Sequence, residues 1–120
     1  MTSLELAKVA AEALDSKLGQ KIRVVRIDGI SSLADYFVFA TGNSTTQVRA
    51  LSEAVEEAMD KRSIPHYGKE GYGSGTWVVL DYASVVVHIF TSEAREYYDL
   101  DRLWSDGEAV PFQKEGNDTV

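Results

Sequence analysis

The 120-residue sequence contains no cysteine and only two prolines. Without cysteine, disulfides, thiolate nucleophiles and cysteine-zinc sites are excluded, and a reducing compartment is favoured. No apolar run approaches the ~20 residues of a membrane span, and the N-terminus lacks the basic-then-apolar pattern of a signal peptide. These absences predict a cytoplasmic protein that does not bind membranes.

Basic residues are scarce. Lysine and arginine total 12 against 19 aspartates and glutamates, which gives a formal net charge of −7. Phosphate binding is built from clustered lysine and arginine, so this balance argues against direct binding to DNA or other bare nucleic acid. Two readings stay open: the charge suits a basic protein partner, or it keeps the domain soluble.

Length and composition predict one globular domain. The chain is long enough for one core and too short for two, and 44% apolar with 26% charged residues is ordinary for a folded protein. We expect the domain to cover residues 1–112. Residues 113–120 should form a disordered tail, with fraying from about residue 107 onward.

Periodic patterns predict helices and strands in alternation. Apolar residues recur at helical spacing over Thr2–Leu18, where Thr2 and Glu5 form a capping-box pattern, and again from a second such box at Ser44–Gln47 to about Arg62. Strands are expected at 21–28, 35–42, 64–67, 76–82 and 85–90. A glycine-rich mobile loop is expected at 68–75, and a last helix at 92–104. The order predicts an α/β or α+β domain, with a mixed sheet flanked by helices.

The predicted hairpin of strands 76–82 and 85–90 brings Asp81 and His88 close together. If Asp81 pairs opposite Val86, then Trp77, Asp81 and His88 share one face, with the last two as diagonal neighbours. Such a pair is either an acid/base couple, as in a hydrolase, or a structural hydrogen bond on a partly solvated face. Since no serine stands in a nucleophile elbow, we favour the structural role.

Other site patterns are weak. Asp99 and Asp101 near the 73–75 loop suggest a magnesium site for nucleotide transfer, but positions two apart on a helix point about 160° away from each other. Ser44 fits a helix cap better than part of an anion site. No P-loop, dinucleotide or zinc motif occurs, and His66 and His88 are isolated, so we expect no cofactor and no metal.

The segment "REYYDLDRLW" (95–104) is rich in aromatic residues for its place near the end of the chain. Projected on a helix, Tyr97, Leu100, Leu103 and Trp104 share the packing face, and Tyr98 lies off it. Exposed tyrosines are common anchors of protein interfaces, although single exposed aromatics also occur without a function. Tyr98 is thus a candidate anchor.

Four stretches together carry a family resemblance: "SLADYFVFATGNS" (32–44), "EG" (70–71), "WVVLDYASVVVHIF" (77–90) and "REYYDLDRLW". In this order they resemble the iojap family, whose bacterial members are the ribosomal silencing factors called RsfS. The likeness runs from the first helix to Trp104. One departure is Ala83-Ser84, where the family usually carries a turn with glycine.

The resemblance implies a non-enzymatic factor that binds the fourteenth protein of the large ribosomal subunit. Bound there, it blocks joining of the small subunit and represses translation when nutrients are scarce. The family is also linked to maturation of the large subunit. Its fold is similar to that of nucleotidyltransferases without their catalytic carboxylates, and free members are typically homodimers.

Combined, the two lines of reasoning predict a partner-binding surface, an aromatic anchor ringed by acids. The competing hypothesis is a degenerate or undetected enzyme, either nucleotidyltransferase-like or a hydrolase using Asp81 and His88. The residues expected at the partner-binding surface are Trp77, Asp81, His88, Glu93, Arg95, Tyr98, Asp99, Leu100 and Asp101.

Overall fold

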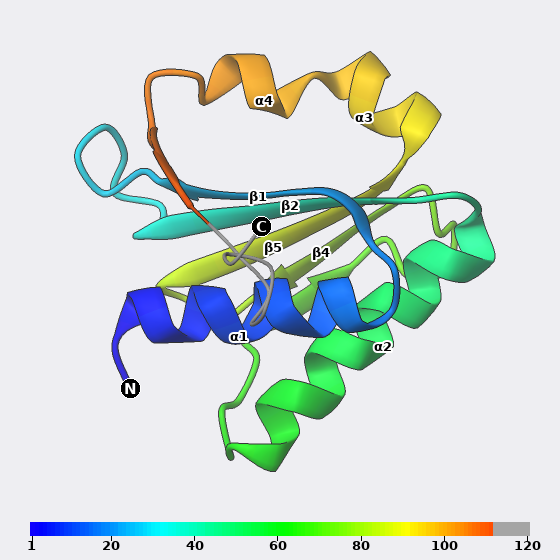
Figure 1. The fold of residues 1–120 in the computed structure, drawn as a ribbon, viewed down its shortest axis with the longest axis horizontal. Helices are drawn as coiled ribbons and strands as arrows, with labels where there is room; N and C mark the ends of the chain where they lie inside the picture. Colours follow the sequence, from blue (N-terminus) through cyan, green and yellow to red (C-terminus); the bar gives the residue numbers. More distant parts are fainter. Residues whose placement is uncertain (112–120) are drawn as a thin grey trace, which may run out of the picture.

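The computed structural model describes residues 1–111, which form a mixed sheet with helices on both faces (Figure 1). The predicted tail at 113–120 lies outside the described residues. This arrangement confirms the expected single-domain α+β fold. In chain order the elements are α1 (Ser3–Ser16), β1 (Gln20–Arg26), β2 (Tyr36–Gly42), α2 (Thr45–Lys61), β3 (Gly68–Glu70), β4 (Trp77–Asp81), β5 (Val85–Thr91), α3 (Ser92–Tyr98), α4 (Leu100–Leu103) and β6 (Glu108–Val110).

The six strands lie in the order β3-β4-β5-β2-β1-β6. β2 and β5 are parallel, and the other neighbours are antiparallel. The parallel pair is possible because α2 carries the chain from β2 to the edge strand β3, from which β4 and β5 follow as antiparallel neighbours back to β2. The β4–β5 hairpin has the predicted register, with Asp81 opposite Val86. Its turn works without glycine: Ala83 takes a φ of 68°, and its N–H donates to Oδ1 of Asp81 at 2.8 Å.

Both long helices begin at the predicted caps. At α1 the Glu5 N–H donates to Oγ1 of Thr2 at 3.1 Å, and the Thr2 N–H donates to Oε1 of Glu5 at 2.7 Å, which is the expected capping box. At α2 the Gln47 N–H donates to Oγ of Ser44 at 3.1 Å, so Ser44 serves as the cap. The Gln47 side chain accepts instead from the N–H of Asn43, so the second box is incomplete. Leu18, expected in the α1 stripe, is 77% exposed because the helix ends at Ser16.

α1 and α2 cover one face of the sheet, below it in Figure 1. The layer between these two helices and the sheet is mainly aliphatic, and its central side chains are inaccessible to solvent. Each such side chain stabilises the fold by roughly 1.5–3 kcal/mol relative to an exposed position. Members with an exposure of at most 2% include Leu14, Val24, Val38, Val48, Leu51, Val55, Met59, Leu80, Val87 and Ile89.

α3 and α4 cover part of the other face, above the sheet in Figure 1. This layer is aromatic. Phe37, Phe39 and Phe90 are buried beneath the two short helices, and Trp77, Val86, Leu100 and Trp104 pack against them while staying partly exposed. Since α3 has seven residues and α4 four, they leave the β4 end of this face partly open.

Two short edge strands differ from expectation. The strand predicted at 64–67 lies instead at Gly68–Glu70, inside the predicted glycine loop, where it pairs with β4. Residues 108–110, expected to fray, form β6 and pair with β1. Neither segment has a periodic pattern of its own, and each is ordered by the partner strand.

The rest of the glycine-rich segment is held by α2. The Arg49 guanidinium donates from Nε to the Tyr72 carbonyl at 2.9 Å and from Nη2 to the Gly73 carbonyl at 2.8 Å, and the Tyr72 hydroxyl donates to Glu53. At Gly71, with φ of 84°, an added Cβ would lie 1.9 Å from the Trp77 carbonyl oxygen. Glycine is therefore required there by a close approach of the backbone.

The helix expected at 92–104 is broken at Asp99, which takes a left-handed conformation with φ of 50°. The break rotates α4 relative to α3. Projecting 92–104 as one continuous helix was therefore wrong for two of the four residues predicted to pack. Leu100 and Trp104 do pack on the aromatic layer, whereas Tyr97 and Leu103 are 82% and 69% exposed. Tyr98 is 49% exposed, as predicted for a residue off the packing face.

Candidate functional site

Trp77 and Tyr98 meet at the open end of the aromatic face, although 21 positions separate them in the sequence. Their ring centroids lie 4.6 Å apart. Trp77 also stacks on Phe90 of the neighbouring strand, with centroids 5.2 Å apart and an interplanar angle of 24°. We call the two partly exposed rings the Trp77–Tyr98 patch. Tyr97, which the helical projection buried, lies edge-on to Tyr98 at 5.1 Å and extends the patch.

His88 lies beneath this patch and is 7% exposed. Its Nδ1 accepts a hydrogen bond from the Trp77 indole Nε1–H at 3.2 Å. Within residues 1–111, its Nε2 has no hydrogen-bond partner. Burial lowers the pKa of His88 to about 4, so the imidazole is neutral at physiological pH.

Asp81 and His88 are diagonal neighbours on one face, as predicted, because Asp81 pairs with Val86 and His88 with Val79. They are not joined by a hydrogen bond within the described residues. Asp81 accepts from the turn at Ala83, and His88 accepts from Trp77. Each side chain therefore serves the fold, and the geometry gives an acid/base couple no support.

Arg95 is a partly buried link between α3 and the sheet, with a side chain 11% exposed. Its guanidinium donates to both carboxylate oxygens of Asp101, at 3.0 and 2.9 Å, to the Lys21 carbonyl at 2.6 Å and to Oγ1 of Thr41 at 3.0 Å. Arg23 also donates to Asp101, at 2.7 Å. These contacts hold the α3–α4 segment on the sheet.

The carboxylate of Asp101 is therefore already engaged. Its partial burial alone would raise its pKa, but the hydrogen bonds and charges of Arg95 and then Arg23 lower it. Asp99 is not helical, so the helical reason for separating the two aspartates was wrong. The hypothesis of a magnesium site at Asp99 and Asp101 still has no support, because the described residues contain no cluster of three or more histidine, cysteine, aspartate or glutamate side chains that could hold a metal.

Glu93 and Leu100, also predicted for partner binding, lie on the two short helices. Glu93 is exposed in the first turn of α3, and Leu100 is half-buried against the aromatic layer. Of the nine residues predicted for partner binding, the structure thus places Trp77 and Tyr98 together at the surface with His88 behind them. A role for any of the nine in binding stays a prediction.

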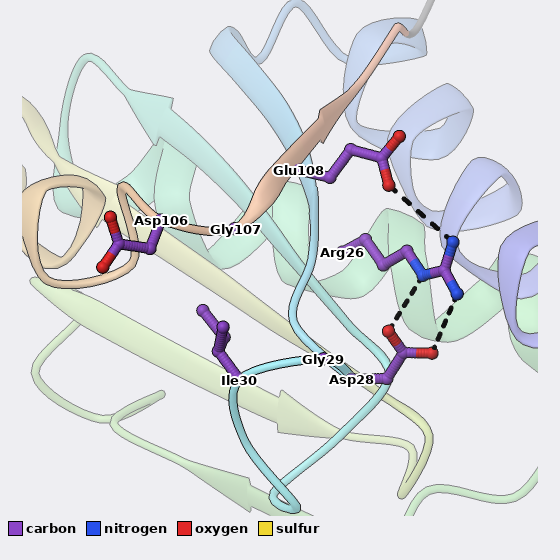
Figure 2. Close-up of a pocket in the computed structure, with 7 residues that line it drawn as sticks. All are labelled: Arg26, Asp28, Gly29, Ile30, Asp106, Gly107 and Glu108. Atoms are coloured by element: carbon purple, nitrogen blue, oxygen red, sulfur yellow. Dashed lines mark hydrogen bonds and ion pairs between the residues drawn. The ribbon is translucent and has the colours of Figure 1, made fainter.

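Two shallow pockets are lined by neither Trp77 nor Tyr98. One, of about 250 Å³, lies between the loop after β1 and the turn before β6, and Figure 2 shows Arg26 pointing toward Asp28 and Glu108 there. Arg26 lies 2.9 Å from Asp28 and 3.7 Å from Glu108, so these charges are paired. The other, of about 240 Å³, is lined in part by Arg95, Asp99 and Asp101. Its charges are of both signs and indicate no single class of ligand.

Within the described residues, no helix has the length and apolar character needed to cross a membrane.

Comparison with known proteins shows what the whole chain is similar to. The family model described as "Ribosomal silencing factor during starvation" matches residues 1–119. The ribosomal silencing factor RsfS of Bacillus subtilis is 38% identical over 106 residues, covering 88% of this chain and 90% of that protein. "Mitochondrial assembly of ribosomal large subunit protein 1" of Mus musculus is 31% identical, over 82% of this chain and 46% of that protein. A solved protein of Chromobacterium violaceum superimposes with a TM-score of 0.86 at 34% identity, over 98% of this chain and 97% of the other.

Proposed function

Because the chain belongs to the RsfS family of ribosomal silencing factors, we propose that it binds the large ribosomal subunit and blocks joining of the small subunit. Its contact there is the subunit's fourteenth protein, and the result is repression of translation when nutrients are scarce. The observation that carries the proposal is the family match over residues 1–119. The relative named for assembly of the mitochondrial large subunit supports a second role in large-subunit maturation.

The Trp77–Tyr98 patch is the docking anchor in this proposal. Large, stiff, half-polar rings are preferred at the centres of protein interfaces, and truncating such an anchor commonly costs ~2 kcal/mol or more. Glu93 and Asp99 are exposed on the neighbouring helical segment, and the chain carries a net charge of −7. The acids around the patch would steer a basic ribosomal protein toward it, so raising the salt concentration should slow association.

The proposed factor acts in the cytoplasm, without catalysis, and forms a homodimer when free. The competing enzymatic hypotheses have lost their geometric support, since Asp81 and His88 are not joined and Asp101 is occupied by arginines. A fold similar to that of nucleotidyltransferases, without their catalytic carboxylates, stays part of the proposal. A thermal-shift screen with nucleotides and Mg²⁺ tests the proposed absence of catalysis: a dose-dependent rise in Tm with a nucleotide would restore the enzymatic hypothesis.

Cosedimentation of Tyr98→Ala with purified large subunits tests the docking surface. We expect binding to weaken roughly tenfold or more, the equivalent of ~1.4 kcal/mol, while the fold stays intact. Leu18→Ala is the matched control, because Leu18 is also a large exposed side chain and directly follows α1, a helix that covers the opposite face of the sheet (Figure 1). If Tyr98→Ala is folded and cosediments as the parent does, the docking surface lies elsewhere.

A further inference from the structure

The Trp77 indole is hydrogen-bonded to a buried histidine, and this bond defines the protonation state of the pair. The distance from Nε1 of Trp77 to Nδ1 of His88 is 3.2 Å. An indole nitrogen can only donate, so Nδ1 of His88 must accept. The proton of the neutral imidazole is then on Nε2.

The imidazole itself is held rigidly. It stacks on Phe39 with centroids 5.5 Å apart and an interplanar angle of 23°, and lies edge-on to Phe37 at 4.8 Å. Phe90 lies nearly parallel to it at 6.2 Å. With aromatic rings around it, His88 cannot turn without disturbing the core of this face.

A histidine at this position costs stability. Its Nε2–H is buried without an acceptor among the described residues, and an apolar side chain of similar size would avoid that loss. The one polar atom of His88 that is satisfied is Nδ1, and its partner is Trp77. Packing alone therefore does not explain why the residue is polar.

We propose that His88 is a positioning residue that holds the Trp77 indole in the orientation needed for docking. This inference rests on the proposed function. Stacking on Phe90 and the tilted contact with Tyr98 restrain the plane of the indole, but a half-turn about its χ2 torsion would keep that plane and exchange the two edges of the ring. The hydrogen bond to Nδ1 selects the orientation in which Nε1 faces His88. An anchor fixed before binding loses less conformational freedom in the complex, which increases affinity.

Two substitutions separate positioning from stability. His88→Leu conserves the volume closely but offers Trp77 no acceptor, whereas His88→Asn is smaller and leaves a void but carries Oδ1 where His88 carries Nδ1. If His88 were only structural, the smaller asparagine would be the more harmful change. If it positions Trp77, leucine would be the more harmful change for binding.

The measurement pairs cosedimentation with large subunits and the indole N–H resonances of a ¹⁵N-labelled sample. The chain has two tryptophans, so Trp104 is an internal reference. In His88→Leu we expect the Trp77 indole resonance to shift upfield and to exchange faster with solvent, the Trp104 resonance to stay in place, and affinity to fall about fivefold. In His88→Asn the Trp77 resonance and the affinity should stay near those of the parent, although Tm falls.

Trp77→Ala, tested in parallel, distinguishes the two possible failures. If Trp77→Ala loses binding while His88→Leu binds as the parent does, positioning by His88 is wrong and the docking surface stands. If Trp77→Ala also binds as the parent does, the docking surface and the positioning role are both wrong. Equal losses of affinity in His88→Leu and His88→Asn would likewise overturn the positioning role, because they would not follow the acceptor.

Discussion

The two faces of the sheet are built in different ways. The face covered by α1 and α2 is mainly aliphatic, and its central side chains have no exposure to solvent. The face covered by α3 and α4 is aromatic, contains the buried imidazole of His88 and the partly buried guanidinium of Arg95, and leaves Trp77 and Tyr98 partly uncovered. The first face makes the fold stable. The second face is covered less completely, and it exposes a pair of ordered aromatic rings to solvent.

The sharpest test of this comparison is a large-to-small substitution on each face. Leu51→Ala on α2 removes a side chain with 0% exposure and should lower the free energy of unfolding by about 2–5 kcal/mol. Leu103→Ala on α4 removes one that is 69% exposed and should change it by less than about 0.5 kcal/mol. Urea denaturation of both variants gives the values. Similar losses would show that Leu103 is packed and that α4 covers its face as closely as α2 covers the other.

The second test uses pH. His88 is neutral in the fold, with its pKa lowered from 6.5 to about 4, so below pH 6.5 the unfolded chain binds a proton that the native state does not. Stability from this group is complete above pH 6.5 and is lost as the pH falls toward about 4. The total is about 3 kcal/mol.

Denaturant unfolding from neutral pH to pH 4 measures this loss, and His88→Leu is the control because it lacks the titrating group. Carboxylates titrate in both proteins, so the difference between the two curves isolates His88. We expect the parent to lose more stability than the variant across this range. Parallel curves would mean that His88 is not buried as a neutral group.

The smallest expected effect separates a partly buried ion pair from an exposed one. Asp101→Asn removes the charge that faces Arg95, whose side chain is 11% exposed, and should cost about 1–2 kcal/mol of unfolding free energy. Asp28→Asn is the matched control: it breaks the pair with Arg26, whose side chain is 50% exposed, and should cost clearly less because solvent screens an exposed pair. Thermal or urea unfolding measures the loss of stability in both variants. Equal losses would show that the Arg95–Asp101 pair does not hold α3 and α4 on the sheet more strongly than an exposed pair would.

Patterns local in the chain were predicted well. The two long helices, their Thr2 and Ser44 caps and the β4–β5 register with Asp81 opposite Val86 all follow from residues near one another in the sequence. Such features depend on periodicity and capping, which a single chain segment carries by itself. The family could be identified for a related reason, because its motifs are contiguous stretches of this sequence.

Local patterns thus specify the class of fold, the main elements and the presence of Tyr98 off a packing face. The formation of β3 and β6 depends on tertiary pairing, because each is ordered by a partner strand. Tertiary packing also breaks the last helix at Asp99, so Tyr97 and Leu103 are exposed, and it pairs Arg95 with Asp101 inside the fold. The meeting of Trp77, His88 and Tyr98 belongs here too, because strand pairing and the placing of α3 bring together side chains that no local pattern connects.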